Sequence, residues 1–360
     1  MPVSAIDTIS PAFQHTRQQL MQPFRFWQWT RLAFVGLLAG EMGSGGCNLP
    51  SNFNIPQQTG SQRHLLDFPS FDPALYAGLI AGAIVAALVL ALIFLYISSV
   101  MRFVLFDSIL AKECRIRLSW SRRHGQGLRY FWWQLGFALA TLAGFVILVG
   151  IPAGIAFALG WLTQPKDHVL GLVLGGILLF LLFVVFAVAA AVIQVMTRDF
   201  VIPQMALEGL GPIEAWRRLW PMIQREKGGY TGYIVMKVVL AIAAAIIIGI
   251  VSLIVGLIFA VPTALLAVVA ILTGKSAGLT WDAYTITIAI VVGCILFFAF
   301  LYLLALIAVP AIVFFPAYSI YFFAARYRAL NLVVYPPPIA PPSATPPPEP
   351  PPPLLPEPIG

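Results

Sequence analysis

Long stretches without a formal charge alternate with short basic stretches along this chain. Residues 73–101, 130–165, 168–197, 238–274 and 283–325 contain no aspartate, glutamate, lysine or arginine. A helix crosses a bilayer with about 20 apolar residues, so each stretch is long enough to span. Lipid offers no partner for an unpaired backbone, and the stretches are too long for barrel strands. The pattern therefore predicts an all-α integral membrane protein.

The first apolar segment, residues 24–40, is shorter than the other five. Only about nine apolar positions follow Arg31. Trp27 and Trp29 are typical of a membrane interface. A helix that begins near Pro23 can still cross if its arginines extend toward the headgroups. We therefore expect about six crossings in total.

Two of the long stretches contain a proline near their middle. Pro152 and Pro262 each remove a helical hydrogen bond. The favoured interpretation is a spanning helix, a kink and a shorter helix at the outer face. The alternative is one long tilted helix. Residues 283–325 are expected to continue as one helix past Pro310 and Pro316.

The basic residues orient the bundle. Residues 1–31, 102–129, 198–227 and 326–360 hold 17 of the 21 lysines and arginines. Positive charge collects on the cytoplasmic side, so both termini are expected in the cytoplasm. We predict a bacterial-type inner-membrane protein with its largest outward loop at residues 42–73.

The segments form a threefold internal pattern. Each unit begins with a basic amphipathic element, at residues 12–20, 118–128 and 214–227. Two crossings follow, and each unit closes with an exit elbow, at residues 100–110, 198–210 and 310–322. The predicted units cover residues 12–111, 117–210 and 213–328 within a membrane domain at 1–330.

The basic elements suit a lipid surface, because an amphipathic helix can lie along the headgroups with its apolar face down. In the third element, tryptophan and leucine side chains share one helical face while arginines supply cationic contacts. The candidate headgroup contacts are Trp120, Arg122, Arg123, Trp216, Arg217 and Arg218.

These features resemble a known family. The motifs "SWSRR" and "AWRR", the paired crossings and the elbow "DFVIP" are similar to those of the YciC-like membrane proteins. They also resemble the membrane domain fused to some glycerophosphodiester phosphodiesterases. The catalytic domain of those enzymes, with its acidic metal-binding cluster, has no counterpart in these 360 residues. The resemblance covers most of residues 12–328 and implies a membrane module of largely uncharacterised role.

Composition narrows the function classes. Apolar residues make up 60% of the chain and charged residues 10%, against about 45–50% and 25% in soluble domains. The chain has a net charge of +7, and its basic residues lie beside the apolar stretches. Membrane lipids, and not nucleic acid, are therefore the expected partner. No phosphate-binding, zinc-protease or nucleophile motif occurs, so we predict no enzyme activity, cofactor or metal site.

Five charged residues at the membrane boundary remain as candidates. Arg198 and Asp199 lie at one elbow, Arg102 and Asp107 at another, and Lys237 lies inside an apolar stretch. Ionisable groups within a membrane often mark an ion or substrate pathway. The favoured interpretation is structural, with charge pairs and helix-end contacts to headgroups. Lys237 can either extend to the interface or pair with an elbow carboxylate such as Asp199.

The C-terminal tail, residues 331–360, is proline-rich and is expected to be extended and disordered in the cytoplasm. It can present itself to an aromatic groove of a protein partner. We predict a non-enzymatic membrane scaffold or regulatory module whose partners bind the tail or the amphipathic helices. The alternative is a transporter or channel for a small or lipophilic substrate.

Overall fold

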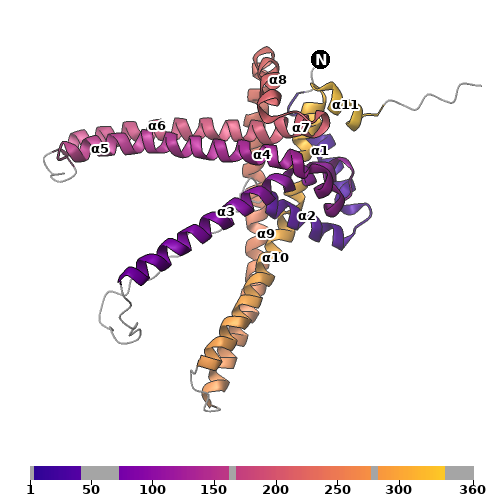
Figure 1. Ribbon diagram of the computed structural model, residues 1–360. Helices are drawn as coiled ribbons and strands as arrows, with labels where there is room; N and C mark the ends of the chain where they lie inside the picture. Colours follow the sequence, from indigo (N-terminus) through magenta and orange to yellow (C-terminus); the bar gives the residue numbers. More distant parts are fainter. Residues whose placement is uncertain (1–3, 42–72, 162–167, 277–282, 337–360) are drawn as a thin grey trace, which may run out of the picture.

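The computed structural model describes residues 4–41, 73–161, 168–276 and 283–336, and every regular element in these ranges is a helix. The elements, labelled in Figure 1, are α1 (Ile9–Met21), α2 (Phe26–Ala39), α3 (Pro73–Leu110), α4 (Ile116–Phe145), the π-helical segment η1 (Val146–Gly150), α5 (Ile151–Ala158), α6 (Val169–Met196), the π-helical segment η2 (Thr197–Val201), α7 (Ile202–Glu208), α8 (Pro212–Arg225), α9 (Lys227–Ser276), α10 (Ala283–Ala324) and α11 (Arg328–Val334).

Five helical stretches in the described residues are long and apolar enough to cross a membrane. They are Gly78–Leu110, Ile116–Ala158, Val169–Glu208, Lys227–Gly274 and Tyr284–Ala324. With 14 residues, α2 is about 21 Å long, which is less than the roughly 30 Å hydrocarbon core. The sixth crossing is therefore not confirmed, although the prediction of an all-helical membrane protein is.

The prolines do not end the long helices. Pro262 lies inside α9, and Pro310 and Pro316 lie inside α10. Pro152 follows η1, where the helix widens for one turn and then continues as α5. Proline has no backbone N–H, so one carbonyl of the preceding turn loses its helical hydrogen bond. A local π-helical adjustment of the backbone can provide that carbonyl with another donor. One continuous helix, the second of the two alternatives, describes the chain at both Pro152 and Pro262.

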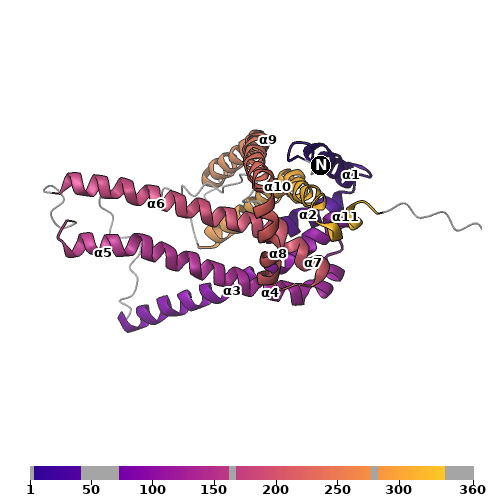
Figure 2. The same ribbon diagram turned by 90° about the horizontal axis from the view of Figure 1, so that it is seen from above.

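The helices form a packed hub from which three arms diverge (Figures 1 and 2). The hub consists of α1, α2, α7, α8, α11 and the adjoining ends of the long helices. One arm is the pair formed by α4–η1–α5 and α6, and another is the pair α9 and α10. The outer half of α3 forms the third arm alone.

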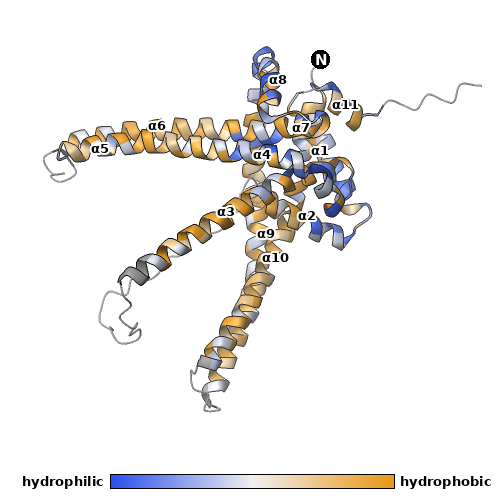
Figure 3. Ribbon diagram, viewed as in Figure 1, coloured by the Kyte–Doolittle hydropathy of each residue, from blue (hydrophilic) through white to orange (hydrophobic). Residues whose placement is uncertain are grey.

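Each paired arm is joined by close contacts between its two helices. Phe145 packs edge-on against Phe183 at 6.0 Å between ring centroids, and Phe259 stacks on Phe300 at 5.7 Å. The arms are apolar along their length, whereas polar residues concentrate at the hub (Figure 3). An apolar surface of this extent requires lipid or other apolar helices around it.

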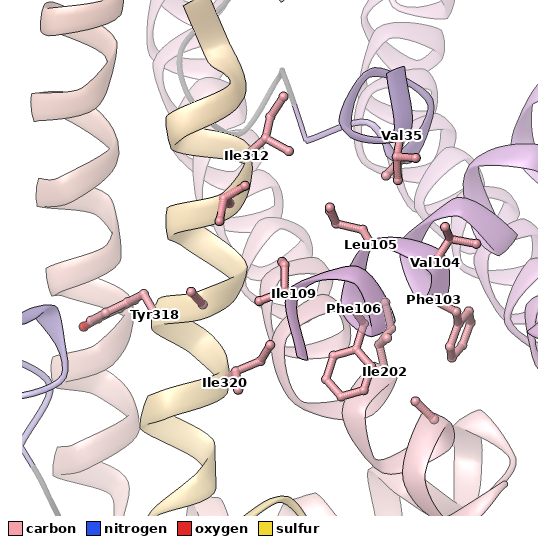
Figure 4. Packing of buried hydrophobic residues seen from close by; sticks show 14 of the residues in the cluster. Val35, Phe103, Val104, Leu105, Phe106, Ile109, Ile202, Ile312, Tyr318 and Ile320 are labelled. Carbon is pink, nitrogen blue, oxygen red and sulfur yellow. The ribbon is translucent and has the colours of Figure 1, made fainter. Parts of the chain in front are cut away.

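The buried core lies in the hub and is built from the three predicted elbows. Buried side chains cluster at 100–109, 196–206 and 305–324, and α1 and α2 cover them. Figure 4 shows Leu105, Phe106 and Ile109 of α3 facing Ile312 and Ile320 of α10. The elbows are thus the sites where the long helices pack together.

Phe200 marks the centre of this packing. Its ring is fully buried and lies 5.1–6.0 Å, between centroids, from four other aromatic rings. Those rings belong to Tyr230, Tyr233, Phe322 and Phe323. The second elbow therefore joins α9 to the end of α10.

Two predicted segments fall partly or wholly beyond this description. The loop at 42–73 and residues 337–360 of the tail lie outside the described residues, apart from position 73, which begins α3. Residues 331–334, which the sequence assigned to the tail, form the end of α11 instead. The three repeat units and the domain boundary at 330 stay predictions.

Candidate functional site

Three of the candidate charged residues, Arg198, Asp199 and Lys237, meet where η2 crosses α9. Arg198 and Asp199 belong to η2, a π-helical turn of the kind that often occurs at functional sites. Lys237 comes from α9, and its Nζ lies 2.5 Å from Asp199 Oδ2. Of the two alternatives for Lys237, the structure has the pairing with Asp199.

A tyrosine completes this ion pair. Tyr233, one helical turn before Lys237, donates its hydroxyl to the same Asp199 Oδ2 at 2.8 Å. The side chains of Lys237 and Asp199 are only 15% and 8% exposed. Removing one partner of such a buried pair typically costs about 3–5 kcal/mol, because the other charge is left without compensation. The pair thus holds α9 to the second elbow.

Arg102 lies close by but bonds to neutral acceptors. Its Nε donates to the Ala39 carbonyl at 3.0 Å, and its Nη1 donates to the Tyr130 hydroxyl at 2.6 Å. The last carbonyls of a helix have no partner within the helix, so Arg102 caps the end of α2. Gly40, with φ of 74°, takes the left-handed conformation at that end. Arg102 therefore ties α2, α3 and α4 together.

These groups surround one small cavity of about 40 Å³. Its charged lining consists of Glu41, Arg102, Arg198, Asp199 and Lys237. Side chains of α3, α7 and α10 supply the apolar walls. Such a volume admits a few water molecules or one small polar group, whereas pockets for organic ligands have about 300–1,000 Å³.

Asp107 does not join this cluster. It accepts two hydrogen bonds from Arg123, each of 2.8 Å, and Arg123 also donates to the Ala206 carbonyl. The two-pronged geometry is the strong form of an arginine–carboxylate pair. It links α3, α4 and α7 at the hub surface.

The six candidate headgroup residues divide into two groups. Arg122 and Arg217 are exposed, and so is Arg218, which pairs with Glu208 and Glu214. Trp120 and Trp216, by contrast, pack against the hub, and Arg123 is held by Asp107. The structure thus leaves three of the arginines at the surface, where headgroups can reach them.

Sequence reasoning missed the tyrosines and Glu41 of the cluster. Tyr233 is four residues before Lys237, a spacing that places both on one helical face, so the sequence held a signal for it. Tyr130 and Glu41 are distant from their neighbours in sequence, and only folding brings Tyr130 to Arg102 and Glu41 to the cavity wall.

His15 is a further buried polar group that the sequence did not single out. Its Nε2 lies 3.0 Å from the Ile109 carbonyl, and its Nδ1 lies 3.1 Å from the Tyr321 hydroxyl. The carbonyl can only accept, so Nε2 carries the proton and Nδ1 accepts from the tyrosine. Burial, with the nearby charge of Lys112, lowers the pKa of His15 below 6.5. A neutral His15 therefore joins α1 to α3 and α10.

The described residues contain no group of three histidine, cysteine, aspartate or glutamate side chains that could hold a metal ion. Comparison with known families then places the chain. Residues 3–333 match a family of unknown function (DUF7544). The chain belongs to this family. No curated protein and no solved structure gives a significant match. The match covers the hub and all three arms, so the cluster lies within the part shared with the family.

Proposed function

We propose that this protein is a non-enzymatic membrane scaffold that docks a transmembrane helix of another protein on its α3 arm. One observation carries the proposal. Among the described residues, the other four long helices run as two pairs, whereas the outer half of α3 has no helix beside it (Figures 1 and 2). Every residue from 78 to 91 is exposed.

The exposed stretch has the composition of a helix-packing face. Gly78, Gly82 and Ala86 follow one another at intervals of four, so they lie on one side of α3. Small residues at this spacing let a second helix approach closely in lipid. A Cβ added at Gly78 or Gly82 would meet no atom of the described residues within 4 Å. The face is thus open to a partner.

Photo-crosslinking in native membranes tests the docking. A photoreactive side chain at position 82 is expected to give an adduct with another membrane protein, and Gly78→Leu is expected to abolish it. The matched control is position 176 on α6, where an added Cβ also meets open space. Equal adducts at both positions, or none at position 82, contradict the proposal. If the adduct instead joins two copies of this chain, the α3 face binds a second copy of the protein and the scaffold proposal is wrong.

Further contacts of the scaffold are proposed on the cytoplasmic side. The exposed arginines of α4 and α8 would bind headgroups, and the proline-rich tail would bind a protein partner. The resemblance to YciC-like proteins, an inner-membrane location, six crossings and cytoplasmic termini belong to the same proposal. Deleting residues 337–360 should release any partner held by the tail. If every partner stays bound after the deletion, the tail is not a binding site.

A transporter is the second candidate, favoured by the ion pair of Lys237 and Asp199 within the long apolar helices. Intramembrane charge pairs of this kind occur on substrate pathways. Lys237→Ala would then abolish uptake by protein reconstituted in vesicles while folded protein is retained. Uptake at the wild-type rate in that variant would exclude Lys237 as a gate.

A further inference from the structure

Among the described residues that line the hub cavity, cationic side chains outnumber carboxylates. Three of its lining side chains are cationic, namely Arg102, Arg198 and Lys237, and two are carboxylates, Glu41 and Asp199. Lys237 is compensated directly by Asp199 at 2.5 Å. The two guanidinium groups have no such carboxylate bond within the described residues.

Arg102 is buried, with 5% exposure, yet its hydrogen bonds reach only a carbonyl and a hydroxyl. Its charge is therefore solvated by dipoles and not neutralised. This arrangement fixes the guanidinium at the cavity wall, because the acceptors come from α2 and α4 while the arginine itself belongs to α3. A preformed cationic group of this kind needs no reorganisation to meet an anion.

Arg198 is the less satisfied of the two. In the described part of the chain it donates no hydrogen bond, and its Nε is buried without a partner. A buried donor without an acceptor costs free energy, and a charged one costs more. Guanidinium groups match carboxylate and phosphate oxygens through paired hydrogen bonds. Glu41 and Asp199 lie near enough to interact with the charge of Arg198, but no carboxylate of the described residues accepts a hydrogen bond from it, so its donors can bind a further anion.

We propose that this cavity binds one phosphate group, held by Arg198 and Arg102, as part of an anionic phospholipid headgroup or as free phosphate. A volume of about 40 Å³ suits a single small group and excludes a larger solute. The singly charged phosphodiester of a lipid would offset the excess positive charge of the lining. Apart from Glu41, the cavity lining comes from η2, α7 and the hub ends of α3, α9 and α10. Figure 3 shows the apolar arms giving way to the polar hub at these elements. Lipid phosphates lie in the polar region that borders the hydrocarbon core.

The test uses the full chain purified in a neutral detergent. Native mass spectrometry of wild-type protein released from phosphatidylglycerol–phosphatidylcholine nanodiscs should show one retained phosphatidylglycerol. Thermal unfolding is then followed while phosphatidylglycerol, phosphatidylcholine or inorganic phosphate is added. The expected result is stabilisation by phosphatidylglycerol, with affinity reduced about 10- to 100-fold in Arg198→Gln. Arg328→Gln, which removes an exposed arginine of α11 that does not line the cavity, is the matched control and should bind as the wild type does.

Each further outcome decides the proposal. Stabilisation by inorganic phosphate alone, lost in Arg198→Gln, supports the site and assigns it to free phosphate. Equal loss in the Arg198 and Arg328 variants overturns it, as does a wild-type protein that retains no lipid and responds to neither anion. If Arg198→Gln does not fold, Arg198→Lys keeps the charge without the paired donors, and unchanged affinity in that variant overturns the proposal. The site is separate from the docking face on α3, so either proposal can fail alone.

Discussion

Replacing Gly127 with alanine tests how closely α4 crosses α3. A Cβ at this position would lie 2.5 Å from Val100 Cγ2 and 3.0 Å from Val100 Cα. The second contact is with backbone, so rotation of a side chain cannot relieve it. Gly125, two residues earlier in the same helix, has open space at its Cβ.

The two substitutions should therefore change stability in opposite directions. Alanine in a helix is favoured over glycine by about 0.5–1 kcal/mol, so Gly125→Ala should be neutral or stabilising. At Gly127 the same gain is opposed by an overpacking cost of about 1–3 kcal/mol, which gives a net loss. The hydrogen bond from Arg102 of α3 to Tyr130 of α4 opposes separation of the two helices. If the helices must move apart to accommodate the added methyl group, loss of this bond increases the destabilisation.

Thermal unfolding in nanodiscs, followed by tryptophan fluorescence, measures both variants against the wild type. The expected order of midpoints is Gly125→Ala at or above wild type, and Gly127→Ala below it. Equal midpoints for the two variants would refute the close crossing.

Three other predictions follow from the hub. Phe200→Ala removes the ring at the centre of the aromatic cluster and should lower the unfolding free energy by about 3–5 kcal/mol, measured by denaturant titration, with exposed Phe298→Ala as control. Asp107→Asn keeps the size of the side chain but removes the charge that Arg123 binds, so the midpoint should fall; an unchanged midpoint would show that the pair contributes nothing. His15 has a pKa below 6.5 because burial favours its neutral form, so the unfolded chain binds more protons in acid. Stability from His15 should be complete above pH 6.5 and fall as pH decreases toward the lowered pKa, with a smaller fall in His15→Gln; equal pH profiles would contradict this.

The cluster at the hub illustrates what could be predicted and what could not. Lys237 stands out in the sequence because it is a single lysine within a long apolar stretch, and pairing with an elbow carboxylate such as Asp199 was one of the two alternatives for it. The role of Arg102 as the cap of α2 was not predicted, because it depends on where α2 ends in space. Asp107 was grouped with Arg102 by sequence, yet the bend after α3 returns α4 so that Arg123 meets it instead.

The sequence by itself determined the long helices and the membrane setting. Both follow from local physics, since a chain of apolar residues in lipid must satisfy its own backbone, and a helix does so within one segment. Tertiary structure alone decided that the three elbows form a common core and that the second half of α3 enters it while the first stands unpaired. It also decided which charges share a cavity. These outcomes depend on side chains from helices far apart in sequence meeting at fixed distances, which no periodicity within one helix can specify.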